Sequence, residues 1–327
     1  MINKQKTILH SVNKDQNRKI RILTWPTHEG YSTSLGYLTN VEFHLIHQPN
    51  GKRWDFHTRK LPDNHYLYFI DPKEFRGECE FDFILAQEKT YQLPQALNLR
   101  DQLGIPVISL NHTEPYPNLS VKRLKKLQDM RGDINIYITE HNKKTWNDPD
   151  GIVINHGIDP NIFCGYIGDN QDAVTMVNHF KNRNVFCGWD IWDTIRKEIN
   201  CTLIGENPGM SESINDVTQL VNRLAQSRVY LNTSTLSPCP LSLLEAAMIG
   251  MPIVSTAYQE IPNIFEHGVN AFLSNDTNEL IKYCLDLFSD KNLAITMGNN
   301  ARNLMIEKFS IEKFISNWNN ILKKDII

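Results

Sequence analysis

The chain has 327 residues, about twice the usual length of a single domain, so two domains are expected. Its 34 basic and 37 acidic residues give a formal net charge of −3, which argues against binding nucleic acid through bulk charge. Hydrophobic residues make up 41% of the chain and charged residues 22%, the composition of a folded globular protein rather than a disordered one.

Several classes of protein lack support in this sequence. No apolar run approaches the roughly 20 residues that cross a bilayer, and the polar start lacks the apolar centre of a signal peptide. The six cysteines are scattered without CxxC spacing, which favours reduced thiols and a cytoplasmic protein. No zinc-binding spacing, P-loop or GxSxG motif occurs, so we expect no metal site.

The first half of the chain alternates short apolar strands with helices. The expected strands are 21–25, 42–46, 66–70, 81–87, 106–111, 134–139 and 152–155. Apolar periodicity predicts helices over 90–103 and 119–130. Near-continuous apolar strands between helices are typical of a parallel sheet covered on both faces.

The second half repeats this alternation after a join at 156–172, which is rich in Gly, Asn and Asp. The expected strands are 173–179, 201–205, 229–233, 252–256 and 271–273. The expected helices are 189–199, 215–226, 241–249, 277–288, 291–307 and 310–323. The sequence therefore predicts an α/β protein with two Rossmann-like, doubly wound domains, 1–156 and 157–308.

The helix at 241–249 is the most informative element. Pro240 suits a helix start and Gly250 a helix stop, and Glu245 is the one charge between them. A carboxylate in so apolar a helix is costly to bury without a hydrogen-bonding partner. Two interpretations stay open: Glu245 lies on the exposed side of the helix, or it receives two hydroxyls such as those of a ribose.

The segment 237–273 resembles the donor-binding motif of the family 4 glycosyltransferases, which are retaining, nucleotide-sugar-dependent enzymes with a GT-B fold. The matching residues are Leu244-Glu245-Ala246-Ala247, Gly250, Pro252-Ile253-Val254, Ile261-Pro262 and Gly268-Val269-Asn270-Ala271. The stretch 152–159 resembles the family's crossover between domains, and 309–322 resembles its last helix. The resemblance implies two domains facing across a cleft: an acceptor domain at 1–156 and a donor domain at 157–308. It also implies that the helix at 309–327 packs back on the first domain.

The resemblance also implies roles for residues around this helix. Glu245 takes the place of the acid that binds the nucleotide ribose, and Ser237 stands where the family usually has a second acid beside the donor sugar. A helix start here offers N–H groups to a diphosphate. The donor-binding residues expected in this segment are Ser237, Pro238, Cys239, Pro240, Leu241 and Glu245.

The diphosphate is expected to meet cations that follow the first strand of the donor domain. Arg183 matches the family's arginine, whereas Cys187 replaces its lysine and Lys181 is the candidate substitute. Asn207, in a loop after a strand, is expected to meet the nucleotide base. With His112, which lies where many members have a histidine near the donor phosphates, Arg183 and Glu245 are the expected catalytic residues. Solvated loop charges or a plain turn are the alternatives.

The acceptor side matches the family less well. His28 and Glu29 follow the first strand in a segment read as a loop, and Glu114 lies two residues after His112. These three are expected to shape the acceptor site, or else are ordinary loop residues. The basic run 122–126 is either a solvated helix face or a contact to acceptor phosphates.

The expected function is transfer of a sugar, with retention, from a nucleoside diphosphate sugar to a hydroxyl. UDP-sugar is the expected co-substrate, with no metal or other cofactor. The acceptor is left open among a glycan, a lipid-linked sugar, a small molecule and a modified DNA base. Two alternatives keep the fold: a catalytically weak nucleotide-sugar-binding protein and a nucleotide-sugar epimerase. A dinucleotide oxidoreductase is disfavoured because no G-x-G-x-x-G occurs.

Overall fold

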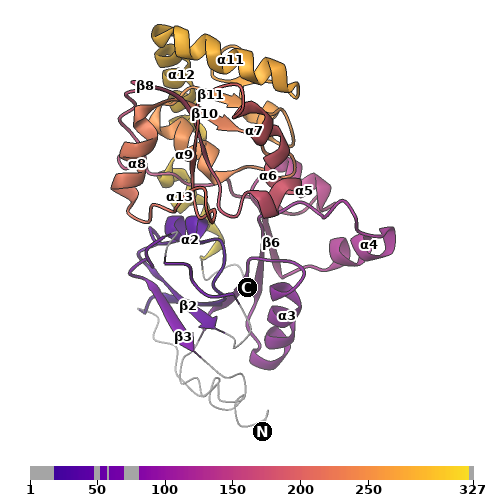
Figure 1. The fold of residues 1–327 in the computed structure, drawn as a ribbon. Coiled ribbons are helices and arrows are strands. Elements are labelled where there is room, and N and C mark those ends of the chain that lie inside the picture. The colour runs from indigo at the N-terminus through magenta and orange to yellow at the C-terminus, as the bar shows by residue number, and fades with distance from the viewer. Residues whose placement is uncertain (1–17, 48–51, 57–58, 70–80, 324–327) are drawn as a thin grey trace. The chain divides into compact units, whose positions relative to one another are not determined.

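The computed structural model describes residues 18–47, 52–56, 59–69 and 81–323. The chain separates into two compact units (Figure 1). The amino-terminal unit comprises the described residues within 1–55, 61–154 and 315–327, and the carboxy-terminal unit comprises those within 56–60 and 155–314. The division between residues 154 and 155 lies two residues before the predicted domain boundary.

The described part of the amino-terminal unit is built on a seven-stranded sheet in the order β3-β2-β1-β4-β5-β6-β7, with every pair parallel. Its strands are β1 (Ile20–Thr24), β2 (Val41–His47), β3 (His65–Phe69), β4 (Phe83–Ala86), β5 (Val107–Asn111), β6 (Ile134–Tyr137) and β7 (Ile152–Val153). The strand order reverses between β1 and β4, so ligands of such a sheet are expected beyond the carboxyl ends of these two strands.

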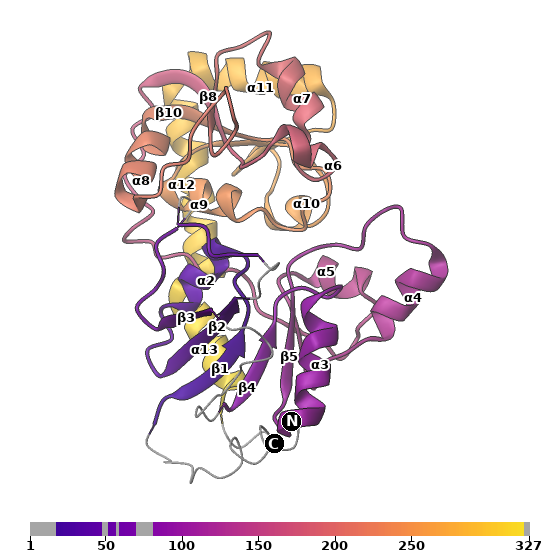
Figure 2. The same cartoon turned by 60° about the horizontal axis from the view of Figure 1, so that its bottom comes forward.

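Helices cover this sheet and connect its parallel strands. They are α2 (Glu29–Leu35), α3 (Gln92–Leu103), α4 (Val121–Asp129) and α5 (Glu140–Thr145). Helix α3 packs along β4 and β5, as Figure 2 shows, and buries Leu93 and Ala96. Helix α4 buries only Leu127, so its basic face is exposed to solvent.

The carboxy-terminal unit has a five-stranded parallel sheet in the order β12-β11-β10-β8-β9. Its strands are β8 (Asn170–Met176), β9 (Cys201–Ile204), β10 (Ser227–Asn232), β11 (Ile253–Ser255) and β12 (Phe272–Leu273). The helical elements are η1 (Lys181–Arg183), α6 (Asn184–Cys187), α7 (Trp189–Ile195), α8 (Val217–Gln226), α9 (Leu241–Ile249), α10 (Ile261–Ile264), α11 (Thr277–Ser289) and α12 (Lys291–Phe309). Here the order reverses between β8 and β10, which locates the ligand-binding edge of this sheet.

A cluster of aromatic rings fixes the turn that follows β8. Phe180 is fully buried and packs edge-on against Trp189, with ring centroids 5.4 Å apart, while Trp192 lies against both rings. Gly188, at φ 71°, joins α6 to α7, and a Cβ there would lie 1.9 Å from the carbonyl oxygen of Thr233. Only glycine fits this position, so the loop after β8 is held against the end of β10.

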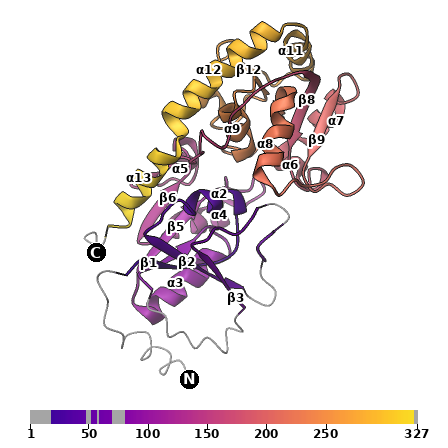
Figure 3. The ribbon, with the colours of Figure 1, turned by 90° about the vertical axis from the view of Figure 1, so that its left-hand side faces the viewer.

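The last helix, α13 (Ile311–Ile321), begins in the carboxy-terminal unit and continues into the amino-terminal one from Ile315. It follows α12 along the chain (Figure 3). Its Trp318 is fully buried and donates from Nε1 to the hydroxyl of Tyr31 at 3.0 Å. The expected return of the carboxy-terminal helix to the first domain is thus part of the fold.

Each predicted strand and helix has a counterpart among the described residues, with ends shifted by up to a few residues, and α7 ends earlier than expected, at Ile195. Residue 70 of the predicted strand 66–70 and residues 324–327 of the predicted helix 309–327 lie outside the described residues. The interpretation of residues 27–30 as a loop is wrong in part, because α2 begins at Glu29. Its sequence EGYSTSL is poor in strong helix formers, and burial of Tyr31 and Leu35 stabilises the helix instead. The sequence analysis also did not predict the short helices η1, α5, α6 and α10.

The fold confirms the expected α/β class, with two parallel, doubly wound sheets. Within the described ranges, no helix combines the length and apolarity that crossing a membrane requires.

Candidate functional site

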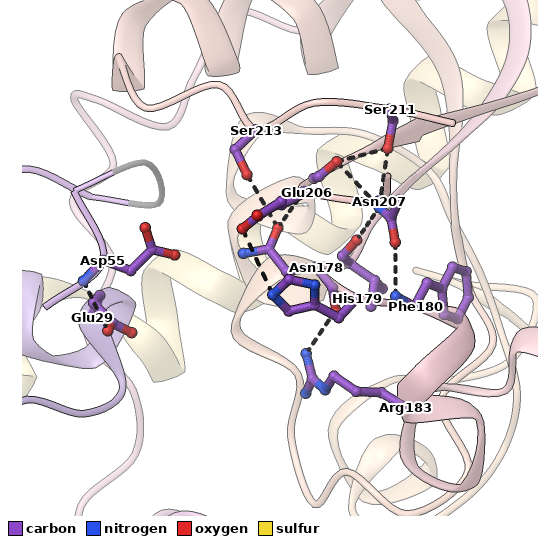
Figure 4. A network of polar contacts seen from close by, with 12 residues as sticks. Glu29, Asp55, Asn178, His179, Phe180, Arg183, Glu206, Asn207, Ser211 and Ser213 are labelled. Atoms are coloured by element: carbon purple, nitrogen blue, oxygen red, sulfur yellow. Dashed lines mark hydrogen bonds and ion pairs between the residues drawn. The ribbon is translucent and has the colours of Figure 1, made fainter. Parts of the chain in front are cut away.

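The loops after β8 and β9 in the carboxy-terminal unit are tied together by Asn207 (Figure 4). Its Oδ1 accepts from the backbone N–H of Phe180 at 2.7 Å, and its Nδ2 donates to the carbonyl of Val177 at 2.8 Å and to Ser211 Oγ at 3.0 Å. Asn207 is 6% exposed. Its side-chain amide is therefore used to hold the two loops together.

An exposed pair of side chains borders this network. His179, at φ 51°, is half exposed, and its Nε2 lies 3.7 Å from a carboxylate oxygen of Glu206, which is also half exposed. The carboxamide oxygen of Asn178 accepts from the backbone N–H of Glu206 at 3.0 Å and from Ser213 Oγ at 3.4 Å (Figure 4). The backbone of both exposed side chains is thus held in place by the side-chain amides of Asn178 and Asn207.

Arg183 and Lys181 place two exposed cations on η1, at the carboxyl end of β8. Arg183 Nη1 donates to the carbonyl of Asn178 at 3.5 Å, a long bond that leaves most of the guanidinium in solvent. Cys187, which stands where a lysine was expected, is buried, and burial raises the pKa of its thiol although the Arg183 cation opposes this. At the carboxyl end of β8, the positive charges that the sequence predicted are therefore those of Lys181 and Arg183 on η1.

Helix α9 begins at the end of the segment that follows β10, and no described side chain caps its first turn. Pro240 occupies the N-cap position, after the buried Pro238 and Cys239, while Ser237 and Leu241 are half-buried. An uncapped helix start carries unsatisfied N–H groups and the positive end of the helix dipole. This terminus and the η1 cations lie at the ends of the two strands that border the switch point, β10 and β8.

His156 supports the segment before α9. It is buried, and its imidazole forms a hydrogen bond with the backbone of Cys239. Burial lowers the pKa of His156 to about 4, so the ring is neutral at neutral pH. The sequence analysis missed this residue.

Glu245 lies one turn inside α9 and is 4% exposed, so the interpretation that places it on the exposed side of the helix is wrong. Its partner is Arg59, whose Nη2 donates to both carboxylate oxygens, at 3.0 and 3.1 Å. Arg59 belongs to the segment 56–60, which groups with the carboxy-terminal unit. Burial raises the pKa of Glu245, and the Arg59 guanidinium opposes that rise.

The sequence analysis also missed Arg59. The ion pair spans 186 residues of chain, and no local pattern marks the arginine. The one signal was the cost of burying Glu245, which required a hydrogen-bonding partner somewhere in the fold.

The amino-terminal unit places three rings at the carboxyl ends of β1 and β5. The His112 ring lies against the His28 ring at a tilt of 34°, with ring centroids 4.0 Å apart, and meets Tyr31 edge-on at 4.6 Å. His112 Nε2 lies 3.2 Å from Gln87 Oε1, so the ring can donate to this oxygen when it carries a proton on Nε2. His28 itself has a left-handed backbone, at φ 49°, as the residue before α2.

The two carboxylates predicted on this side are engaged within the unit. Glu29 is 7% exposed, and its Oε2 accepts from Lys52 Nζ at 3.0 Å. Glu114 is 3% exposed, and its Oε1 accepts from Asn142 Nδ2 at 3.2 Å. Both therefore hold neighbouring loops in position. In the part of the chain that the structure describes, no three His, Cys, Asp or Glu side chains are grouped to hold a metal ion.

The structure thus groups the predicted residues by unit. Those expected to bind the donor lie at the ends of β8, β9 and β10: Arg183, Lys181, Asn207, Ser237, Pro238, Cys239, Pro240, Leu241 and Glu245. Those expected on the acceptor side, with His112, follow β1 and β5: His28, Glu29, His112 and Glu114.

Comparison with known proteins relates the carboxy-terminal unit to a protein family. Residues 172–304 match the family described as glycosyl transferases group 1. The match contains β8, η1, α9 and Glu245.

Individual relatives agree with this family. N-acetyl-alpha-D-glucosaminyl L-malate synthase of Bacillus anthracis is 33% identical over 100 residues, which cover 30% of this chain and 26% of the relative. An uncharacterized glycosyltransferase of Haemophilus influenzae is 33% identical over 99 residues, covering 29% and 28%. The chain is thus aligned with little more than a quarter of either relative.

Solved structures match over nearly the whole chain. Anabaena HepE in complex with UDP and glucose superposes with a TM-score of 0.72 at 14% identity, covering 94% of this chain and all of that one. Sucrose-phosphate synthase of Thermosynechococcus elongatus also gives 0.72, at 13% identity, covering 94% and 99%. These matches confirm the predicted GT-B fold class.

Proposed function

We propose that the protein is a glycosyltransferase that moves a sugar from a nucleoside diphosphate sugar to a hydroxyl group. The observation that carries the proposal is the set of groups around the β8–β10 switch point. The Arg183 cation, the uncapped start of α9 and the buried carboxylate of Glu245 lie within the residues that match the glycosyl transferases group 1.

Arg183 and the N-terminus of α9 are proposed to hold the diphosphate. A planar guanidinium binds two phosphate oxygens at once, and helix N–H groups bind a third. Negative charge grows on the leaving diphosphate as the sugar bond breaks, so fixed positive groups there accelerate the reaction. Lys181, on the same turn as Arg183, adds a second positive charge.

Glu245 is proposed to accept hydrogen bonds from the two ribose hydroxyls. Both of its oxygens now accept from Arg59, so a bound ribose must share or replace this contact. Arg59 also opposes the rise of the Glu245 pKa that burial causes, which keeps the carboxylate an acceptor. Arg59 is thus proposed to keep Glu245 ionised, so that the carboxylate can accept hydrogen bonds from the donor's ribose.

The donor is proposed to be a UDP-sugar, reacting with retention and without a metal ion. HepE, which shares the fold, has been crystallised with UDP-glucose. Retention follows from analogy with the family, with the acceptor attacking from the side of the leaving group. The acceptor class stays open among a glycan, a lipid-linked sugar, a small molecule and a modified DNA base. The name of the Bacillus relative adds a hydroxy acid to the small molecules worth testing.

The test is incubation of the purified protein with UDP-, GDP- and ADP-sugars and candidate acceptors, followed by mass spectrometry. A glycosylated product with free nucleotide supports the proposal, and the same result in EDTA supports metal independence. An inverted anomeric centre in the product would contradict retention.

A second candidate is a nucleotide-sugar-binding protein with little catalysis. Ser237 in place of an acid, and the buried Cys187 in place of a lysine, favour it because each removes a charge from the donor site. Saturable nucleotide-sugar binding without turnover would support this candidate. An isomerised sugar still attached to its nucleotide would indicate an epimerase.

A further inference from the structure

Trp318 of the carboxy-terminal helix reaches the ring of His112 through one intermediate side chain. Trp318 Nε1 donates to the Tyr31 hydroxyl at 3.0 Å, and the Tyr31 ring meets the His112 ring edge-on, with centroids 4.6 Å apart at 80°. Trp318 is fully buried and Tyr31 is 2% exposed. All three residues belong to the amino-terminal unit.

The surroundings of His112 show what the Tyr31 contact does. The His28 ring lies against the imidazole at a tilt of 34°, with centroids 4.0 Å apart, and Gln87 Oε1 lies 3.2 Å from Nε2. The Tyr31 ring meets the imidazole edge-on, at 80°. His28 and Tyr31 both come from the start of α2, so any movement of that helix moves both of these ring contacts.

The bond between α13 and α2 explains why this short helix stays in place. Helix α2 has seven residues, of which the five between Glu29 and Leu35 have low helix propensity, and its N-cap residue makes no side-chain cap with the described residues. A buried indole N–H and a buried phenol each need a hydrogen-bonding partner, and here they satisfy one another. Removing either partner takes away a buried hydrogen bond that ties α2 to α13, which favours a shift of α2.

We propose that Tyr31 and Trp318 are positioning residues that hold the imidazole of His112 in the orientation and tautomer needed for sugar transfer. The claim rests on the proposed function, because the family resemblance implies that His112 acts in sugar transfer, near the donor phosphates. Under this proposal, the carboxy-terminal helix α13 also supports the imidazole of His112 in the amino-terminal unit.

The test compares Tyr31→Phe, Trp318→Phe and the double variant with the matched control Tyr137→Phe. Tyr137 lies in the same unit, is fully buried and donates its hydroxyl to Asp148 at 2.8 Å, so its loss removes a comparable buried bond that involves neither α2 nor α13. We expect each test variant to lower kcat about tenfold, with an unchanged KM for the donor, since small misplacements of a catalytic group act on kcat. The double variant should be no slower than either single one, because both remove the same bond.

A second readout is independent of activity. Nitrogen NMR of histidine-labelled protein, assigned with His112→Gln, reports which ring nitrogen carries the proton. We expect wild type and Tyr137→Phe to show the Nε2–H form of His112, and Tyr31→Phe and Trp318→Phe to show a mixture of tautomers or a broadened signal. Urea unfolding should show similar losses of stability in Tyr31→Phe and Tyr137→Phe, which separates positioning from stability.

The outcomes distinguish this inference from the function it rests on. If wild type is active but kcat and the His112 signal are unchanged in both test variants, the positioning role is wrong. If wild type transfers no sugar, the proposed function fails, and the NMR signal alone decides whether Tyr31 and Trp318 fix the imidazole. Independent, multiplicative losses of kcat in the double variant would also overturn the proposal.

Discussion

The carboxyl ends of the two parallel sheets carry polar groups in different states. In the carboxy-terminal unit, Arg183 and Lys181 are exposed and the start of α9 has no side-chain cap among the described residues. In the amino-terminal unit, the carboxylates of Glu29 and Glu114 are buried and bonded to Lys52 and Asn142.

This difference explains why the two halves of the chain differ in how much function their sequences reveal. A site for a charged diphosphate needs exposed cations and helix N–H groups, which leave a motif of fixed spacing. A site whose polar side chains are paired within the fold recognises its ligand by shape and by a few remaining groups, and no motif records that. The carboxy-terminal unit accordingly matches a family over residues 172–304, while the acceptor stays open.

The largest effect is expected on the carboxy-terminal side, from Arg183→Ala. Removing one fixed donor to the developing charge should lower kcat/KM by about 10²–10³-fold. Steady-state kinetics with a confirmed donor checks this. Arg196→Ala is the matched control, because Arg196 is exposed on the same unit and pairs with Asp193. A kcat/KM for Arg183→Ala equal to that of the control would contradict the proposal that Arg183 binds the donor diphosphate.

The next effect concerns the amino-terminal side, where Lys89 is 4% exposed and its Nζ has no hydrogen-bond partner among the described residues. The amine lies 4.9 Å from the ring centroid of Trp146, and burial lowers the pKa of Lys89 to about 7. Replacing this amine by the apolar Lys89→Met should raise the free energy of unfolding by roughly 1–3 kcal/mol at pH 7, the cost of a buried polar group without a partner.

The pH dependence of that gain follows from the lowered pKa. Between about pH 7 and pH 10 the unfolded chain holds a proton on Lys89 that the folded protein lacks, so wild-type stability rises with pH in this window. The advantage of Lys89→Met should therefore be full below about pH 7 and shrink by pH 9. Urea unfolding at pH 6, 7 and 9 measures it, with Lys144→Met at an exposed position as control. An advantage that is equal at all three pH values contradicts the account.

A smaller effect is expected from Arg59→Ala, which tests whether Arg59 controls the ionisation of Glu245. Without the guanidinium, burial raises the pKa of Glu245 further, so more of the carboxyl is protonated as the pH falls. A protonated acid is a poorer acceptor for ribose, and we expect UDP to bind Arg59→Ala about tenfold more weakly at pH 6 than at pH 8. Arg59→Lys, which keeps the charge, should retain the shallower wild-type profile. Identical pH profiles in Arg59→Ala and wild type would show that Arg59 does not control Glu245.

The smallest effect is expected for the basic run on α4. Lys122 and Lys126 are exposed, so Lys122→Ala/Lys126→Ala should change the free energy of unfolding by less than about 0.5 kcal/mol. The same variant separates the acceptor classes. A KM raised for a phosphate-bearing acceptor, and relieved by salt, would assign the run to that acceptor, whereas an unchanged KM leaves it as a solvated face.

The sequence predicted much of the fold because the residues that begin and end helices lie at the limits of the segments with apolar periodicity. Helix α9 has the predicted bounds, since Pro240 and Gly250 mark its two ends. Helix α2 was missed because Tyr31 and Leu35 stabilise it by burial against distant elements, which local propensity does not record.

The candidate site was predictable only in its local parts. Arg183 and Glu245 lie in patterns of fixed spacing, whereas Arg59 approaches Glu245 from 186 residues away along the chain. Asn207 has the predicted place but a buried amide, because side-chain direction depends on the loops packed around it. The support of His112 by Trp318 likewise depends on the path of the last helix.

Isothermal titration of UDP into wild type, Glu245→Gln and the exposed-residue control Glu198→Gln tests the assignment of the donor site most directly. The account predicts saturable 1:1 binding to wild type and to Glu198→Gln, and at least tenfold weaker binding to Glu245→Gln, as expected for hydrogen bonds to a charged acceptor. Equal affinity in all three proteins would show that the nucleotide does not meet the buried acid of α9.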